Sequence, residues 1–283
     1  MHEVNPSRTA LRVALRRAAH QLHDAKPLVF DDPLAVRILG KEFFEEVKRT
    51  PDSVKRPFSA ALRAFMVVRA RLAEDTLAAG VRDLGVRQYL VLGAGLDTFA
   101  CRNPHADVRV FEVDHPATQA WKRGQLETAG IALPPSLRFV SVDFETQQLG
   151  ERLAGAGLRA DERAFFSWLG VSMYLTRAAI GATLGYVAGL PRGSGIVFDY
   201  AVPPAGLSPV RRLVVHALLK RVAAAGEPWK TFFEPRALVA ELRALGFTEL
   251  EDLGTEELNA RFFGERSDGL RTGALGRVMC ARS

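Results

Sequence analysis

The sequence predicts an α/β protein with a mostly parallel, doubly wound sheet. From residue 88 onward, short apolar runs bounded by glycine or acidic residues recur, which is typical of buried strands. Segments with helical spacing separate several of these runs, and strands that alternate with helices form parallel sheets. The first run, QYLVLG at 88–93, leads into a Gly-x-Gly turn, which favours a ligand bound at the end of that strand.

The first third of the chain is predicted to be helical. Over 7–23 the apolar residues recur at helical spacing; they are Leu11, Ala14, Leu15, Ala18 and Leu22. The opposite stripe is expected to face solvent and consists of Arg12, Arg16, His20 and His23. In FDDPLAVRIL at 30–39, Asp31 or Asp32 can cap a helix that has Pro33 in its first turn. A long helix is expected over about 59–79, so that 1–80 forms a helical cap.

Seven strands are expected in a single domain over 1–283. They lie at 88–93, 108–114, 137–143, 164–170, 195–201, 247–254 and 276–282. Helices are expected between them at 116–130, 176–190 and 235–246. The segment 203–233 breaks this alternation and is predicted to be an inserted helical lid. Cap and lid would cover the carboxyl ends of the strands, where open sheets bind ligands.

Composition and charge exclude several classes of function. The net charge of +6 comes mainly from dispersed arginines. The sequence has no run of five or more like charges, so a charged tail that binds nucleic acid is not predicted. Cys101 and Cys280 are far apart, so neither a disulfide framework nor a metal site is predicted. The N-terminal MHEVNPSRTALR lacks the apolar core of a secretory signal, and no apolar stretch is long enough to span a bilayer. We therefore expect a cytoplasmic monomer or homodimer that acts on a small molecule.

The glycine turn at the end of the first strand distinguishes between two cofactors. A dinucleotide site uses G-x-G-x-x-G to place a pyrophosphate at a helix N-terminus. Here Gly93 and Gly95 are present, but Thr98 replaces the third glycine and Asp97 lies inside the turn. An acid there would repel a pyrophosphate, whereas it suits an ammonium or ribose hydroxyls. The turn therefore favours S-adenosylmethionine, which has no phosphate, over NAD.

Acidic residues end the next two strands. Asp114 follows Gly95 by 19 residues (114 − 95), close to the spacing of about 20 expected for an acid that binds ribose. Asp143 and Phe144 follow the third strand, and a carboxylate with an aromatic ring suits an adenine. Each acid alone is more simply explained as a helix cap. Together with Asp97 of the glycine turn they place acids at three successive strand ends, and this set indicates a nucleoside site at one edge of the sheet.

The sequence resembles the leucine carboxyl methyltransferase family, and more closely its bacterial S-adenosylmethionine-dependent O-methyltransferases. The resemblance covers nearly the whole chain, and its most specific blocks are GAGLDT at 93–98 and FEVDHP at 111–116. VVRARLAED at 67–75, FFSWLGVSMYLT at 165–176 and GEPWKTFF at 226–233 also carry it. It implies a Rossmann-like class I methyltransferase fold with a helical N-terminal cap and an inserted lid.

The resemblance also implies roles for individual residues. Arg69 would pair with the cofactor carboxylate, the turn would contact its methionine part, Asp114 its ribose, and Asp143 and Phe144 its adenine. The full cofactor set is Arg69, Gly93, Ala94, Gly95, Asp97, Asp114, His115, Asp143 and Phe144. The catalytic candidates are Arg17, His20 and Tyr174. Eukaryotic members carry a glutamate where this chain has Leu169, so their leucine-peptide substrate is not implied.

The residues leave several alternatives open. Arg69 could instead pair with Glu74 or Asp75, Tyr174 could be a core tyrosine, and Asp199 is a candidate substrate contact. A carboxylate acceptor would need no base, whereas a hydroxyl acceptor would use a histidine, and the candidates are His20, His23 and His115. We expect an O-methyltransferase for a small, fairly apolar molecule, as in secondary metabolism. The rival functions are an NAD-binding oxidoreductase, a nucleic-acid methyltransferase and a non-catalytic cofactor-binding protein. The second of these is disfavoured because the sequence has neither an N/D-P-P-Y/F motif nor a Pro-Cys nucleophile.

Overall fold

A seven-stranded sheet forms the centre of the part of the chain that the structure describes. The computed structural model describes residues 7–49, 56–204, 212, 215–216, 219–220, 223–224, 228–273 and 276–283. The strand order is β3-β2-β1-β4-β5-β7-β6. The strands are β1 (Gln88–Leu92), β2 (Arg109–Asp114), β3 (Leu137–Ser141), β4 (Ala164–Trp168), β5 (Gly195–Tyr200), β6 (Glu249–Leu253) and β7 (Arg277–Arg282). Because β7 alone runs antiparallel to its neighbours, the predicted mostly parallel sheet is confirmed, with every strand end within two residues of its predicted position.

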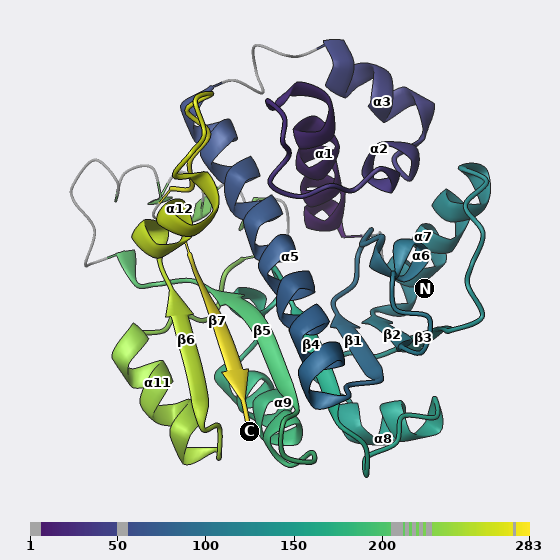
Figure 1. Ribbon diagram of the computed structural model, residues 1–283, viewed down its shortest axis with the longest axis vertical. Coiled ribbons are helices and arrows are strands. Elements are labelled where there is room, and N and C mark those ends of the chain that lie inside the picture. Colours follow the sequence, from purple (N-terminus) through teal and green to yellow (C-terminus); the bar gives the residue numbers. More distant parts are fainter. Residues whose placement is uncertain are drawn as a thin grey trace.

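Helices cover both faces of the sheet (Figure 1). The helices described are α1 (Arg8–His23), α2 (Leu34–Arg37), α3 (Gly40–Arg49), α5 (Pro57–Leu84), α6 (Phe99–Arg102), α7 (Pro116–Thr128), α8 (Leu149–Gly155), α9 (Arg177–Ala188), α11 (Pro235–Ala244) and α12 (Thr255–Phe263), with a 3₁₀ turn, η1 (Ser172–Tyr174). Helices α5 and α12 pack on one face, and α8, α9 and α11 pack on the other. None of these described helices has the length and apolar character of a membrane span.

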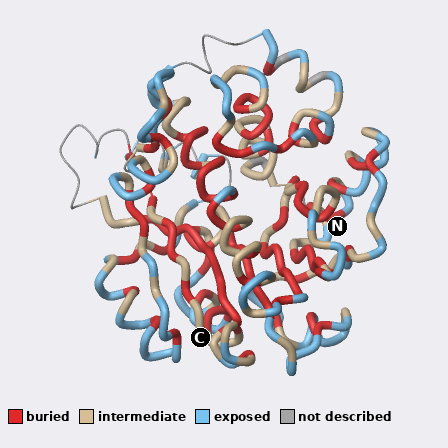
Figure 2. The backbone as a smooth tube through the Cα atoms, viewed as in Figure 1, coloured by how far each residue is buried: buried red, intermediate tan, exposed pale blue. Residues whose placement is uncertain are grey.

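Coverage on both faces explains why the central strands are apolar along their whole length. Alternate side chains of β1 enter opposite cores: Tyr89 and Val91 pack with α5, while Leu90 and Leu92 pack with α8 and α9. Every residue of β1, β4 and β5 is consequently buried (Figure 2). Packing on both faces therefore fixes the positions of the carboxyl ends of these strands.

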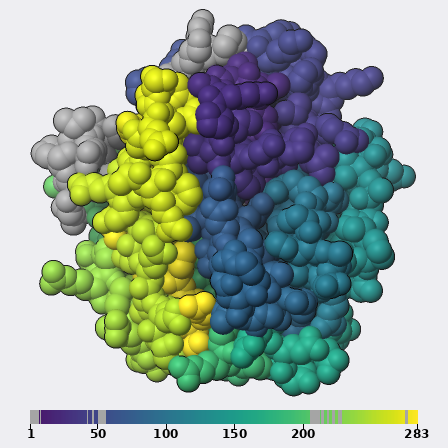
Figure 3. Space-filling model, viewed as in Figure 1, coloured from purple at the N-terminus to yellow at the C-terminus, as the bar shows by residue number. Residues whose placement is uncertain are grey.

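The cap helices α1, α2 and α3 lie at the carboxyl end of the parallel strands (Figure 1). Helix α5 is 28 residues long and extends from the cap along the sheet, where it contacts β4 and β5. The segment after α12 holds the cap in place, because the Arg266 guanidinium donates to the carbonyls of Pro27 and Ala25 at 2.6 and 2.8 Å. Figure 3 shows this C-terminal segment against the N-terminal cap. Residues 1–6 and 50–55 of the predicted cap, and most of the predicted lid 203–233, lie outside the described residues.

Two expectations for the cap are wrong. His20 does not face solvent but is fully buried, because α5 and the segment after α1 cover that side of the helix. Its Nδ1 lies 2.7 Å from Asp24 Oδ2, and Arg63 of α5 binds the same carboxylate. Asp32 does not cap α2, which begins without a side-chain cap. The Asp32 carboxylate instead binds Arg17, because both are buried between α1 and the glycine turn.

Candidate functional site

A cavity of about 410 Å³ opens where β1, β2, β3 and β4 end, below α1 and beside α5. The strand ends meet there because parallel strands present their carboxyl ends at one edge of a sheet. Of the predicted site residues, those that line this cavity are Arg17, Arg69, Gly93, Ala94, Gly95, Asp97, Asp114, His115, Asp143, Phe144 and Tyr174. His20 does not line it, since its ring is buried behind α1 with Asp24 and the backbone N–H of Phe30.

The glycine turn after β1 forms the floor of the cavity. Gly93 and Gly95 have φ values of +67° and +49°, a region that side-chain-bearing residues rarely adopt. A Cβ on Gly93 would lie 2.3 Å from Cγ2 of Val171, and one on Gly95 would lie 3.0 Å from Cβ of Ala10. Both positions therefore need glycine for conformation and for space, and α1 lies directly against the turn.

Asp114 connects the glycine turn to the end of β2. Its Oδ2 accepts from the Gly95 N–H at 2.6 Å, and its Oδ1 accepts from the His115 N–H at 2.7 Å. Burial raises the pKa of Asp114, although these two hydrogen bonds oppose the shift. The His115 ring caps α7 by accepting from the Ala117 N–H at 3.3 Å. The carboxylate is thus held at the cavity wall by backbone donors, in a fixed orientation.

Asp143 and Phe144 form the wall that follows β3. Asp143 Oδ1 accepts from the Glu145 N–H at 3.0 Å. The Phe144 ring packs 6.2 Å from the Trp168 ring, which is fully buried in β4. The Asp143 carboxylate and the Phe144 ring, which packs on the core, are therefore neighbours. This pair could bind an aromatic base that carries an exocyclic amine.

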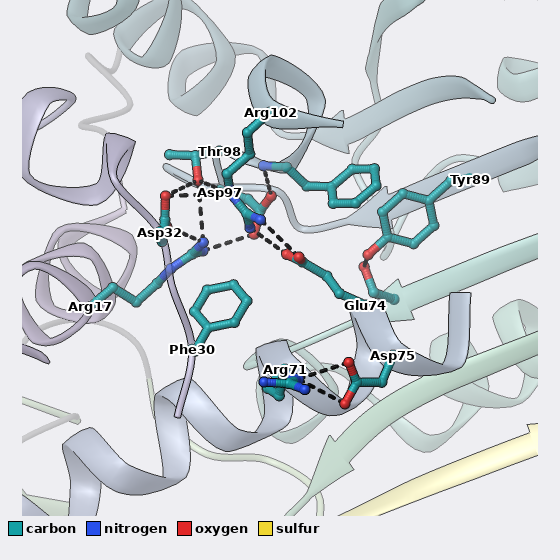
Figure 4. A network of polar contacts seen from close by, with 12 residues as sticks. Arg17, Phe30, Asp32, Arg71, Glu74, Asp75, Tyr89, Asp97, Thr98 and Arg102 are labelled. Atoms are coloured by element: carbon teal, nitrogen blue, oxygen red, sulfur yellow. Dashed lines mark hydrogen bonds and ion pairs between the residues drawn. The ribbon is translucent and has the colours of Figure 1, made fainter. Parts of the chain in front are cut away.

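A buried ion-pair network lies behind the turn (Figure 4). Arg17 donates to Asp97 Oδ2 at 2.8 Å and to Asp32 Oδ2 at 2.5 Å. Burial disfavours ionised Asp97, but the positive charges of Arg17, Lys122 and Arg102 outweigh it and lower the pKa of Asp97 to about 2. Arg17 thereby ties α1 to the turn.

The second half of the network contains Arg102 and Glu74. Arg102 donates to both carboxylate oxygens of Glu74. Both guanidiniums lie over the Phe30 ring, with Cζ of Arg17 5.2 Å and Cζ of Arg102 4.9 Å from its centroid. Figure 4 shows these side chains converging from α1, the segment that follows it, α5 and α6.

Arg69 has a partner that neither sequence alternative named. Its Nη1 lies 2.6 Å from Oδ2 of Asp199 in β5, while Glu74 and Asp75 pair with other arginines. Asp199 Oδ1 also accepts from the Gly170 N–H at 2.5 Å. Asp199 is therefore the buried counter-ion of Arg69, and it is not among the residues that line the cavity as a substrate contact would.

Several lining residues were not predicted as site residues. Glu74 lies on α5 four residues after Ala70 and eight after Met66, so helical spacing within the VVRARLAED block could have found it. Lys230 lies in the GEPWKTFF block, and its ammonium binds Glu145 Oε1 at 2.9 Å. The Lys230 N–H donates to the Met173 carbonyl at 2.7 Å, which places this segment beside η1 and Tyr174.

No three His, Cys, Asp or Glu side chains gather as a metal site within the described ranges. The arrangement can instead bind hydroxyl and amine donors through carboxylates, an aromatic base through Phe144, and a carboxylate through Arg69. These are the groups of a nucleoside that carries an amino-acid arm.

Comparisons with known proteins show similarity in sequence and in fold to methyltransferases. A family model described as leucine carboxyl methyltransferase matches residues 10–188. YktD of Bacillus subtilis (strain 168), a proposed S-adenosyl-L-methionine-dependent methyltransferase, is 33% identical over 293 residues and covers 95% of each chain. Two solved structures share the fold. A proposed methyltransferase from Thermobifida fusca YX has a TM-score of 0.58 and 17% identity, and the match covers 100% of this chain and 96% of that chain. A DUF574 family protein from Streptomyces avermitilis MA-4680 has a TM-score of 0.56 and 18% identity, and the match covers 94% of this chain and 100% of that chain.

Proposed function

This chain belongs to the leucine carboxyl methyltransferase family of S-adenosylmethionine-dependent methyltransferases, and from that premise we propose that it methylates a carboxylate or hydroxyl oxygen of a small molecule. One observation carries the proposal: the glycine turn of β1 and the carboxylates that end β2 and β3 line one cavity. Thr98 stands where a dinucleotide turn has its third glycine, which makes NAD the weaker candidate.

The residues of the cavity fit S-adenosylmethionine group by group. Ribose hydroxyls are donors and the Asp114 carboxylate accepts, while Asp143 accepts from the adenine amine and Phe144 packs on the base. Arg69 binds the cofactor carboxylate, because a guanidinium has five donors and can keep Asp199 at the same time. The backbone of Gly93, Ala94 and Gly95 lines the cavity and would contact the methionine arm.

The chain's own residues position the acceptor and exclude water. When bound, S-adenosylmethionine supplies a methyl group already activated by a positively charged sulfur. Arg17 keeps α1 against the turn through Asp97, so Val13 and Ala14 of α1 form an apolar wall of the cavity. Tyr174 of η1 contributes a substrate contact on another wall. Methyl transfer is a displacement at an already activated carbon, so the protein accelerates it mainly by positioning the acceptor oxygen and by excluding water.

The acceptor is a small, fairly apolar molecule. Met66, Leu169 and Val171 line the cavity and favour apolar contacts. A carboxylate acceptor reacts without a base at neutral pH, whereas an alcohol or phenol needs one. Of the three candidate histidines His115 lines the cavity, but its Nδ1 already accepts from the Ala117 N–H, and His20 is buried away from the cavity. A carboxylate acceptor, which needs no base, is therefore the better fit to these residues.

Calorimetric titration of the purified chain tests the cofactor assignment. We expect S-adenosylhomocysteine to bind and Asp114→Asn to weaken it about 10- to 100-fold, the value of one or two hydrogen bonds to a charged group. Asp107→Asn is the matched control, since Asp107 is exposed and does not line the cavity. Tighter binding of NAD, or an unchanged affinity in Asp114→Asn, would contradict the assignment. A cofactor complex that methylates no carboxylic acid or phenol of a small-molecule panel would favour the non-catalytic alternative.

A further inference from the structure

The ion-pair network behind the glycine turn has unequal numbers of charges. It contains two guanidiniums, Arg17 and Arg102, and three carboxylates, Asp32, Asp97 and Glu74. The Asp32 side chain is fully buried and the other four side chains are 7–20% exposed. A buried carboxylate without a compensating charge is costly, so the network lacks one positive charge.

The excess negative charge falls on one of the two carboxylates that line the cavity. Glu74 and Asp97 both line the cavity, whereas Asp32 does not. The charge of Asp97 is compensated, since neighbouring cations lower its pKa to about 2. At Glu74 the ion pair with Arg102 compensates the charge only in part, since burial outweighs it and raises the pKa of Glu74. A cation that enters the cavity would therefore gain most beside Glu74.

Helix α5 presents two opposite charges to the same cavity. Arg69 lines it as a cation and Glu74 lines it as an anion. Arg102 occupies one lone pair on each Glu74 oxygen, and a carboxylate oxygen has two, so a further donor can be accepted. A cation and an anion that flank one space match the two charged groups of an α-amino acid.

We infer that Glu74 binds the α-ammonium of the cofactor's amino-acid arm and that this ammonium supplies the positive charge that the network lacks. The inference rests on the proposed function and adds a specificity-determining residue to it. Glu74 selects for ligands with a free amine, while Arg69 selects for the carboxylate. The adenosine part is bound independently by the residues after β2 and β3.

Titration with three adenosine thioethers tests this assignment. The probes are S-adenosylhomocysteine, its desamino analogue, which keeps the carboxylate, and its decarboxylated analogue, which keeps the amine. Glu74→Gln should weaken the two amine-containing probes about tenfold or more and leave the desamino analogue unchanged. Equal losses for all three probes, or no loss for any, would overturn the assignment.

A second variant separates ligand binding from folding. Arg102→Gln breaks the same ion pair but keeps the Glu74 carboxylate, so it should lower the unfolding temperature while keeping the preference for amine-containing probes. If Arg102→Gln abolishes that preference as Glu74→Gln does, the role of Glu74 is structural and the inference fails. Failure of the proposed function looks different, because the unmodified chain would then bind none of the three probes.

Discussion

Replacement of Gly93 by alanine tests whether the glycine turn requires both its backbone conformation and its free space. A residue with a side chain at φ +67° costs about 1–2 kcal/mol in the left-handed region. The new Cβ would also lie 2.3 Å from Cγ2 of Val171, a contact that forces a shift worth about 1–3 kcal/mol. We therefore expect Gly93→Ala to lower the free energy of unfolding by about 2–5 kcal/mol.

A double-mutant cycle separates the two contributions. In a Val171→Ala background the clashing methyl is gone, and the next contact, the Val171 Cβ, is at an ordinary 3.5 Å. Gly93→Ala should then cost only the conformational part, about 1–2 kcal/mol. Gly124→Ala is the matched control: Gly124 is in the exposed middle of α7 with nothing within 4 Å, so alanine should stabilise by about 0.5–1 kcal/mol.

Urea unfolding of the four proteins of the cycle and of the control measures these values. The same samples, titrated with S-adenosylhomocysteine, should show weaker binding for Gly93→Ala than for Gly124→Ala. The reasoning is refuted if Gly93→Ala costs the same with and without the Val171 methyl groups, since the steric contribution would then be absent.

Three further predictions concern buried or partly buried groups. Arg69→Met should destabilise the fold by about 3–5 kcal/mol, because it leaves Asp199 buried without its counter-ion. In urea unfolding, the double variant Arg69→Met/Asp199→Asn should recover part of that loss. A double variant no more stable than the single one would contradict this prediction. Asp97→Asn should lower the free energy of unfolding by about 2 kcal/mol at pH 7, because the pKa of Asp97 is lowered from 3.8 to about 2. This stabilisation is present above about pH 4 and is lost as the pH falls toward 2. A difference in unfolding free energy between the two proteins that does not vary with pH would count against the prediction. Burial raises the pKa of Cys101 and raises that of Cys280 to about 12. Both thiols should therefore react slowly with an aromatic disulfide reagent at pH 8 in the native chain and quickly in urea. Fast labelling of the native chain would refute the burial argument.

The strands, the glycine turn and the acidic wall could be predicted from the sequence because their signals are local. An apolar run such as QYLVLG identifies a buried strand by its own residues. Once the sheet is parallel, Gly95, Asp114 and Asp143 must meet at one edge, since parallel strands end on the same side. The site at this edge therefore followed from local patterns and one rule of topology.

The ion-pair partners were decided by tertiary packing. Arg69 pairs with Asp199 across 130 residues of chain, and Arg17 pairs with Asp97 across 80. Nothing local distinguishes those carboxylates from nearer ones, so Arg69 was equally compatible with Glu74 and Asp75. Likewise, the burial of His20 depends on α5 and the segment after α1 covering a helix face that is polar by sequence.

The sequence by itself determined the fold class, the edge of the sheet that binds the ligand and the residue types placed there, because hydrophobic periodicity and glycine turns act over a few residues. Only the tertiary structure decided which charges compensate one another and that Glu74 is left short of a cation beside the cavity. The reason is physical: the free energy of a buried charge depends on all the groups packed around it, and those groups come from distant parts of the chain.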